Sequence, residues 1–169
     1  KLGRVPASVW ESTELERLNL ADNHLSTVSE EIGKLTKLRM LDLGHNELTS
    51  IPETLYGLKE LRFLYLSNNR LNSISPSIGR LKALIYLNIT DNQLTSLPES
   101  IGELSNLVEL RLYNNQIESL PHSIGRLSKL QELHAMQNRL DALPPSIGKL
   151  KSLKKLILQG NAITALPDS

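Results

Sequence analysis

The sequence predicts a solenoid, a fold in which copies of one short unit stack on one another in chain order. Three observations lead to it. Apolar residues alternate over positions 84–89, as they do in a strand with one buried face. This stretch opens a 23-residue unit, 84–106, which recurs along the chain with no insertion or deletion. A unit this small cannot bury its own apolar side, so its neighbours must stack on it and share one continuous core.

Two columns of recurring residues mark the copies. Each copy opens with a leucine, and the seven are Leu15, Leu38, Leu61, Leu84, Leu107, Leu130 and Leu153. An asparagine stands at the ninth position of every copy, namely Asn23, Asn46, Asn69, Asn92, Asn115, Asn138 and Asn161. The side-chain amide of asparagine donates and accepts hydrogen bonds, so it can satisfy backbone groups at a buried turn. We therefore predict a structural role for this column, with ligand binding as the open alternative.

These columns and the residues between them read LxxLxLxxNxLxxLPxxIGxL over essentially the whole chain. The pattern resembles that of the leucine-rich repeat superfamily, in the 23-residue subclass typical of cytoplasmic and bacterial members. The resemblance implies an α/β fold: a curved, right-handed β/α superhelix with a parallel concave sheet of about seven strands. Short helical or extended segments would form the convex side. The resemblance implies little about function.

The repeat register divides residues 1–169 into the units of a single domain. A partial repeat, 1–14, precedes six full repeats that start at residues 15, 38, 61, 84, 107 and 130, and a second partial repeat occupies 153–169. Strands are expected near 17–19, 40–42, 63–65, 86–88, 109–111, 132–134 and 155–157. Neither end offers a convincing polar cap, so we expect a segment of a longer protein.

Several residues depart from the repeat pattern, and three of them bear on the core or on the convex side. Trp10 fills a slot that glycine usually occupies, and we expect it to cover part of the first repeat. Tyr56 replaces glycine in a convex segment, a variation that needs no functional explanation. Ala135 stands at the sixth position, where the other copies have leucine or isoleucine. Losing a leucine side chain from a packed core typically costs about 2–5 kcal/mol, so either this repeat is a soft point or Met136 and its neighbours fill the space.

Composition limits the possible classes of function. The net charge is +1, which disfavours a general nucleic-acid-binding protein. No run of 18 apolar residues is present, so no membrane insertion is expected. The sequence contains no cysteine, whereas the secreted relatives that the resemblance suggests usually close their ends with disulfides. A cytoplasmic or bacterial protein, including a secreted bacterial effector, is therefore favoured over a disulfide-capped extracellular one.

The concave face, which carries the third, fifth and seventh positions of each repeat, is rich in large apolar residues. The chain has six aromatic residues and two methionines, and six of these eight fall in those columns: Met40, Phe63, Tyr65, Tyr86, Tyr113 and Met136. Large apolar side chains on a surface that folding does not require mark an interaction site. The alternative is that aromatic residues merely suit exposed strand positions. Because Met40, Phe63, Tyr65 and Tyr86 adjoin across three strands, we favour binding.

The same face becomes charged toward the C-terminus, with Glu109, Arg111, Glu132 and His134 in the same columns. Two carboxylates beside a histidine suggest acid–base catalysis or a metal site. Ion pairing across neighbouring strands is the competing interpretation, and we favour it. An open sheet does not exclude water from a reaction, and the other histidines have no metal-ligand spacing. We predict no catalytic residue, no metal and no cofactor, and we count these four residues among the partner contacts.

Charge is also sorted between the two edges of the predicted sheet. Positions twenty to three of the repeat carry 14 of the 19 Lys and Arg residues and 7 of the 18 Asp and Glu residues. This basic edge can steer an acidic partner or can be an ordinary solvated surface. The sequence as a whole predicts a non-enzymatic protein–protein recognition module that binds a protein or peptide on its concave face. The alternative is the recognition domain of a larger enzyme, such as a bacterial effector ubiquitin ligase or a kinase.

Overall fold

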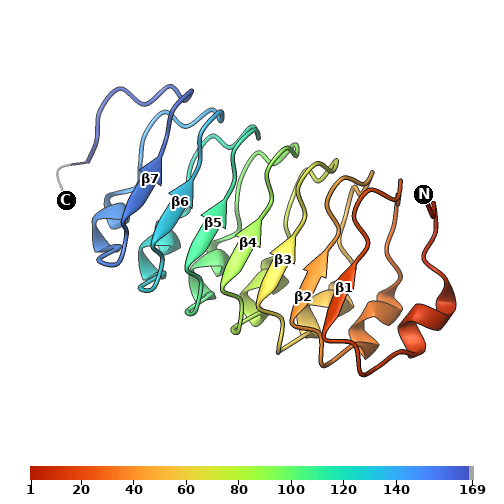
Figure 1. Cartoon of the computed structure of the whole chain (residues 1–169). Coiled ribbons are helices and arrows are strands. Elements are labelled where there is room, and N and C mark those ends of the chain that lie inside the picture. The colour runs from red at the N-terminus through yellow and green to blue at the C-terminus, as the bar shows by residue number, and fades with distance from the viewer. Residues whose placement is uncertain (168–169) are drawn as a thin grey trace.

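A computed structural model describes residues 1–167 as seven strands that alternate with seven 3-10 helices (Figure 1). The strands are β1 (Arg17–Asn19), β2 (Met40–Asp42), β3 (Phe63–Tyr65), β4 (Tyr86–Asn88), β5 (Glu109–Arg111), β6 (Glu132–His134) and β7 (Lys155–Ile157). The 3-10 helices are η1 (Ala7–Glu11), η2 (Glu30–Lys34), η3 (Glu53–Gly57), η4 (Pro76–Arg80), η5 (Glu99–Glu103), η6 (His122–Arg126) and η7 (Pro145–Lys149). No helix in this part of the chain is long and apolar enough to cross a membrane.

The strands form one open parallel sheet in the order β1 to β7, and the register advances by one repeat at each step. All seven strands lie at the predicted residues. Identical repeat positions therefore stand side by side, so that Met40 pairs with Phe63 and Phe63 with Tyr86. The connecting segments return on the other side of the sheet, where the helices are arranged in a parallel row (Figure 1).

The core lies between the sheet and the row of helices. The middle residue of each of the strands β1 to β6 is a buried leucine, and its two neighbours in the strand are less buried. Isoleucines of the helices, such as Ile78 and Ile101, are fully buried on the opposite wall. Since each repeat contributes the same positions, the apolar contacts continue from one repeat to the next as the solenoid architecture requires.

The asparagine column forms a hydrogen-bonded ladder, which confirms the predicted structural role. In the central repeat, the Asn92 side chain donates to the carbonyls of Leu66, Ile89 and Thr90 at 3.0 to 3.3 Å. Its Oδ1 accepts from the backbone N–H of Leu71 at 3.0 Å. These bonds pair backbone groups of two successive repeats at a buried turn, where unpaired groups would be costly.

Two aromatic residues occupy glycine slots of the helical side. At Gly102, a Cβ atom would lie 2.3 Å from the carbonyl oxygen of Ser123, so only glycine fits between η5 and η6. Tyr56 and Trp10 hold the equivalent slots in η3 and η1 and are 2% and 3% exposed. Burial raises the pKa of Tyr56 to about 12. Both residues are therefore members of the core, and the burial of Trp10 is consistent with the prediction that it covers part of the first repeat.

Carboxylates of the helical side cap the following repeat. Glu99 accepts hydrogen bonds from the backbone N–H groups of His122 at 3.1 Å and Ser123 at 2.9 Å, where η6 begins. The bond from the Ser123 backbone is the main reason that the pKa of Glu99 lies below its ordinary value. Glu30 makes the same type of bond to Thr54 at η3.

The lowered pKa of Glu99 predicts a pH-dependent contribution to stability. The contribution is present above the unfolded-state pKa and is lost as the pH falls through the lower folded-state pKa. Glu99→Gln should therefore reduce the urea midpoint at pH 7, and the difference from the parent should shrink in strong acid. Glu118→Gln, at an exposed carboxylate, is the control. A difference between Glu99→Gln and the parent that stays constant with pH would contradict the capping role.

Ala135 remains the one small residue in its core column. It is 1% exposed, while Met136, which follows it, is only half-buried. Because Met136 retains this exposure, we expect it to leave core space beside Ala135 unfilled. Ala135→Leu should then raise the denaturant midpoint by filling a leucine-sized site, with a gain of about 1 kcal/mol. A lower midpoint would show that the site is already filled and that leucine overpacks it.

Protection from hydrogen exchange should differ along the solenoid. Leu64, Leu87 and Leu110 in the central strands are fully buried, but Leu156 and Leu158 at β7 are only half-buried. We expect exchange to be fastest in residues 1–14 and 153–167 and slowest in the central repeats. Exchange resolved by mass spectrometry of peptide fragments measures this directly. Uniform protection over all seven strands would contradict the expectation.

Candidate partner-binding face

The concave face is built by the first and third residues of each strand, because the middle residue points into the core. Eight of the ten predicted site residues are first or third residues of the strands β2 to β6. Phe63 is 37% exposed and is one of three large apolar residues in this exposure class within residues 1–167. Met40, Tyr65 and Tyr86 are half-buried. The face is thus accessible but not fully solvated.

Met40, Phe63, Tyr65 and Tyr86 form one contiguous group, which we call the aromatic patch. Met40, Phe63 and Tyr86 are direct neighbours in the sheet register. The rings of Tyr65 and Tyr86 lie 5.0 Å apart between centroids, at a tilt of 39°. This distance is within the range in which aromatic pairs attract one another. A pocket of about 400 Å³, which we call the patch pocket, opens beside Met40, Phe63 and Tyr65, and the remaining lining is charged.

Arg111 joins the aromatic patch to the charged part of the face. Its guanidinium carbon lies 5.7 Å from the centroid of the Tyr86 ring, a cation–π geometry. Its Nε donates to Glu109 Oε1 at 2.5 Å. Burial raises the pKa of Tyr86, so its hydroxyl stays protonated and can donate or accept a hydrogen bond at neutral pH.

Glu109, Arg111, Glu132 and His134 form the second group, which we call the charge cluster. His134 Nε2 lies 2.9 Å from Glu132 Oε2 and 4.0 Å from Glu109 Oε1. Lys155 on β7 reaches Glu132 Oε2 at 3.0 Å. Hydrogen bonds from His134 and then Lys155 lower the pKa of Glu132. The cluster is therefore a set of mutually neutralising groups.

The structure differs from the sequence prediction in one pairing of the charge cluster, and it adds the geometry of the metal site that the sequence left as an alternative. The pair of Arg111 and Glu109 lies within one strand, whereas we expected pairing across strands; Lys155 supplies the cross-strand partner of Glu132 instead. The ligand atoms of Glu109, Glu132 and His134 also lie within 4.8 Å of one another, a spacing that a metal ion could use. Arg111 and Lys155 already hold those carboxylates, so a cation would have to displace them.

Tyr113 and Met136, the other two predicted contacts, lie outside both groups. Each is the second residue after its strand, β5 or β6, and each is half-buried. Within residues 1–167, no ring contact or side-chain hydrogen bond joins either of them to the aromatic patch or to the charge cluster, but Tyr113 interacts electrostatically with Tyr86 and Arg111. They extend the concave face toward the turns that carry the asparagine ladder.

Ile85 and Val108 are partly exposed apolar residues that the sequence interpretation missed. They occupy the second position of their repeats, immediately before the strands, and both are half-buried. They line a pocket of about 370 Å³ with Arg62, Ala83, Asn106 and Lys129, which we call the edge pocket. The sequence does distinguish these two residues, because the residues at the second position of the other repeats are all charged or polar: Glu16, Arg39, Arg62, Gln131 and Lys154.

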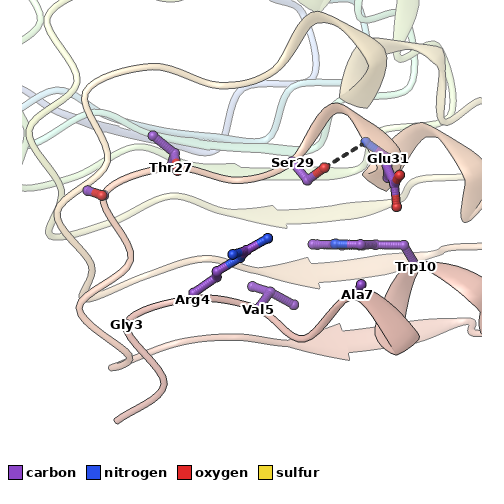
Figure 2. Close-up of a pocket in the computed structure, with 9 residues that line it drawn as sticks. Gly3, Arg4, Val5, Ala7, Trp10, Thr27, Ser29 and Glu31 are labelled. Atoms are coloured by element: carbon purple, nitrogen blue, oxygen red, sulfur yellow. Dashed lines mark hydrogen bonds between the residues drawn. The ribbon is translucent and has the colours of Figure 1, made fainter.

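A further pocket, of about 500 Å³, lies away from the sheet surface between the first two return segments. Figure 2 shows the indole of Trp10 and the side chains of Arg4 and Val5 along it, with Glu31 and Ser29 on the neighbouring segment. Ser29 Oγ accepts a hydrogen bond from the backbone N–H of Glu31 at 3.2 Å. None of the predicted site residues lines this pocket.

Comparison with known families identifies the repeat. A profile described as a leucine-rich repeat region matches residues 72–159, and a leucine rich repeat profile matches residues 13–71. Comparison with curated proteins finds no match.

Several solved structures share the fold over nearly the whole chain. A leucine-rich repeat protein of Leptospira interrogans is 31% identical, with a TM-score of 0.76 over 96% of this chain and 47% of its own. The ectodomain of the Arabidopsis thaliana receptor kinase GASSHO1/SCHENGEN3, solved with CASPARIAN STRIP INTEGRITY FACTOR 2, is 34% identical, with a TM-score of 0.86 over 96% and 20%. The plant peptide hormone receptor RGFR1, solved with RGF2, is 32% identical, with a TM-score of 0.72 over 93% and 30%. The chain thus spans less than half of the length of these relatives.

Proposed function

Because the chain belongs to the leucine-rich repeat family, whose solved members include receptors bound to their ligands, we propose that it is a non-enzymatic recognition module for a protein or peptide partner. The partner lies on the concave face, across the aromatic patch and the charge cluster. The single observation that carries this proposal is the aromatic patch. It places four large apolar side chains together on a sheet surface whose leucines point the other way.

The two groups on this face have different roles in the proposal. The aromatic patch supplies the binding energy, because aromatic anchors in half-buried surroundings dominate most interfaces. The charge cluster supplies orientation and selectivity, because its groups are satisfied by one another and gain little from a new partner. Tyr113 and Met136 belong to the outer contacts.

A larger enzyme that uses this segment for recognition is the second candidate. It is supported by the receptor kinase among the relatives and by the small share of those relatives that the chain spans. The full gene sequence separates the two: a flanking kinase or ubiquitin ligase domain favours the second, and repeats alone favour the first.

The proposal can be tested without knowing the natural partner. A displayed library of random peptides is selected on the immobilised chain, and the recovered peptides are measured against parent, Phe63→Ala and Tyr86→Ala. Leu2→Ala is the matched control, because Leu2 is another exposed apolar residue, 51% exposed, at the N-terminus. Most of the recovered peptides should bind the two patch variants more weakly than the parent and should bind Leu2→Ala as tightly as the parent. Equal binding to all of these proteins would place the site elsewhere.

A further inference from the structure

The concave face alone is small for a stable interface. Six spacings of about 4.8 Å separate the seven strands, and a width of about five residues at about 3.3 Å gives on the order of 490 Å². A standard interface uses about 800 Å² on each partner. A partner of this face therefore reaches that area by contacting an edge of the sheet as well, or by lying on further repeats of a longer array.

The edge that carries the second repeat position is continuous with the aromatic patch. Arg62 lines both the patch pocket, beside Phe63, and the edge pocket, beside Ile85 and Val108. Backbone hydrogen bonds join this column directly: Ile85 N donates to the Arg62 carbonyl, and Val108 N to the Ile85 carbonyl, each at 2.8 Å. The two pockets thus form one surface with an arginine between them.

The charge around this surface is strongly positive. Arg17, Arg39 and Arg62 line the patch pocket, and Lys129 lines the edge pocket. Arg39 is already paired at 3.4 Å with the one carboxylate in the lining, Glu16, and at 3.4 Å with Glu60 outside it. Within residues 1–167, Arg17 and Arg62 form no ion pair, and the ammonium of Lys129 is held by the neutral Asn106 at 2.7 Å. Three cationic groups are therefore available to an anionic partner.

We propose that this surface binds an extended acidic peptide segment with two apolar side chains three or four residues apart. One side chain sits on Met40 and Phe63, the other on Ile85 and Val108, and a carboxylate between them faces Arg62. The proposal rests on the proposed function, since it uses part of the same patch, and it adds the partner's chemistry and its route over the edge.

The spacing of the two anchors follows from the repeat. The first anchor site, Met40 and Phe63, lies on β2 and β3, and the second, Ile85 and Val108, lies immediately before β4 and β5. Two repeat spacings of about 4.8 Å separate them, or about 10 Å. In a polyproline II segment, side chains three residues apart point to the same side and lie about 9.3 Å apart. In a β-strand, side chains four residues apart point to the same side and lie about 13 Å apart.

Sequencing the peptides selected on the immobilised chain tests this proposal. Peptides enriched on the parent chain should carry Asp or Glu between two apolar residues three or four positions apart. Selection on Arg62→Glu should lose that acidic residue or replace it with Lys or Arg. Ile85→Ala and Val108→Ala should relax the preference at one apolar position only. For a synthetic peptide from the enriched set, Glu→Gln in the peptide and Arg62→Ala in the protein should each weaken binding about tenfold, with little further loss when they are combined.

The outcomes separate this proposal from the one on which it rests. One outcome is that the selected peptides bind Phe63→Ala more weakly but show no acidic preference and bind Arg62→Glu and Ile85→Ala as tightly as the parent. This outcome would overturn the edge proposal and leave the concave-face function standing. Peptides that bind Phe63→Ala and Tyr86→Ala as tightly as the parent would overturn both proposals. A selection that yields no binder even at low salt would also overturn both. Unfolding midpoints of every variant confirm that the compared proteins are folded.

Discussion

Asn92→Ala should lower the free energy of unfolding by about 2–3 kcal/mol, far more than truncation of an exposed asparagine. The three carbonyls that Asn92 bonds each keep a second donor, for example Asn69 at the Leu66 carbonyl. The N–H of Leu71 has no such substitute, because Asn92 Oδ1 is its acceptor in a fully buried setting. The cost is therefore that of one unpaired buried donor together with the lost ladder contacts.

Urea unfolding of parent and variant measures this loss. Asn72→Ala is the matched control, because Asn72 is an exposed asparagine that follows Leu71 in the preceding repeat and whose side chain bonds only Ser73. We expect the control to stay within about 0.5 kcal/mol of the parent. If the two variants unfolded at the same midpoint, the ladder would not be a source of stability.

Truncation of the aromatic patch should separate binding from stability. Phe63→Ala or Tyr86→Ala is expected to weaken a concave-face ligand at least tenfold, or about 1.4 kcal/mol. The unfolding midpoint should move little for Phe63→Ala, because that side chain is 37% exposed and lies on the face opposite the leucine core. Tyr86→Ala should cost more stability, because it also removes the contacts with Tyr65 and Arg111.

The loss of affinity is measured by fluorescence anisotropy, with a labelled peptide from the selection titrated against each protein. Leu2→Ala controls for a nonspecific effect of removing an exposed apolar side chain. A patch variant that binds as tightly as the parent while remaining folded would mean that the patch is not the energetic centre.

The strands could be predicted to the residue because two independent columns fix each repeat. The leucine before each strand and the asparagine after it enclose seven residues, and the alternation of apolar residues inside this stretch centres the strand on three of them, as at Phe63–Tyr65. The secondary structure of the return segments could not be predicted as closely, because proline and serine at their starts are compatible with either an extended chain or a short helix. In the structure they are 3-10 helices, and the glycine slots explain their close approach.

The candidate site was predicted in composition but not in detail. Alternation along the strands identifies which side chains share a face, so Phe63 and Tyr86 could be placed together. It does not fix side-chain rotamers, and the pairing of Arg111 with Glu109 in one strand depends on them. Ile85 and Val108 were not predicted because they precede the strands. Outside a strand, the alternation of apolar and polar residues does not indicate on which face a side chain lies.

The most direct test of the central claim uses the four tyrosines of the chain. Biosynthetic fluorotyrosine gives one fluorine resonance for each of them, which single Tyr→Phe variants assign. Tyr65 and Tyr86 lie in the patch and Tyr113 beyond it, while Tyr56 is buried in the helical side and serves as an internal control. On addition of a concave-face ligand, we predict that the resonances of Tyr65 and Tyr86 shift together along one saturation curve while that of Tyr56 stays fixed. Saturable binding that leaves Tyr65 and Tyr86 unmoved would contradict the account.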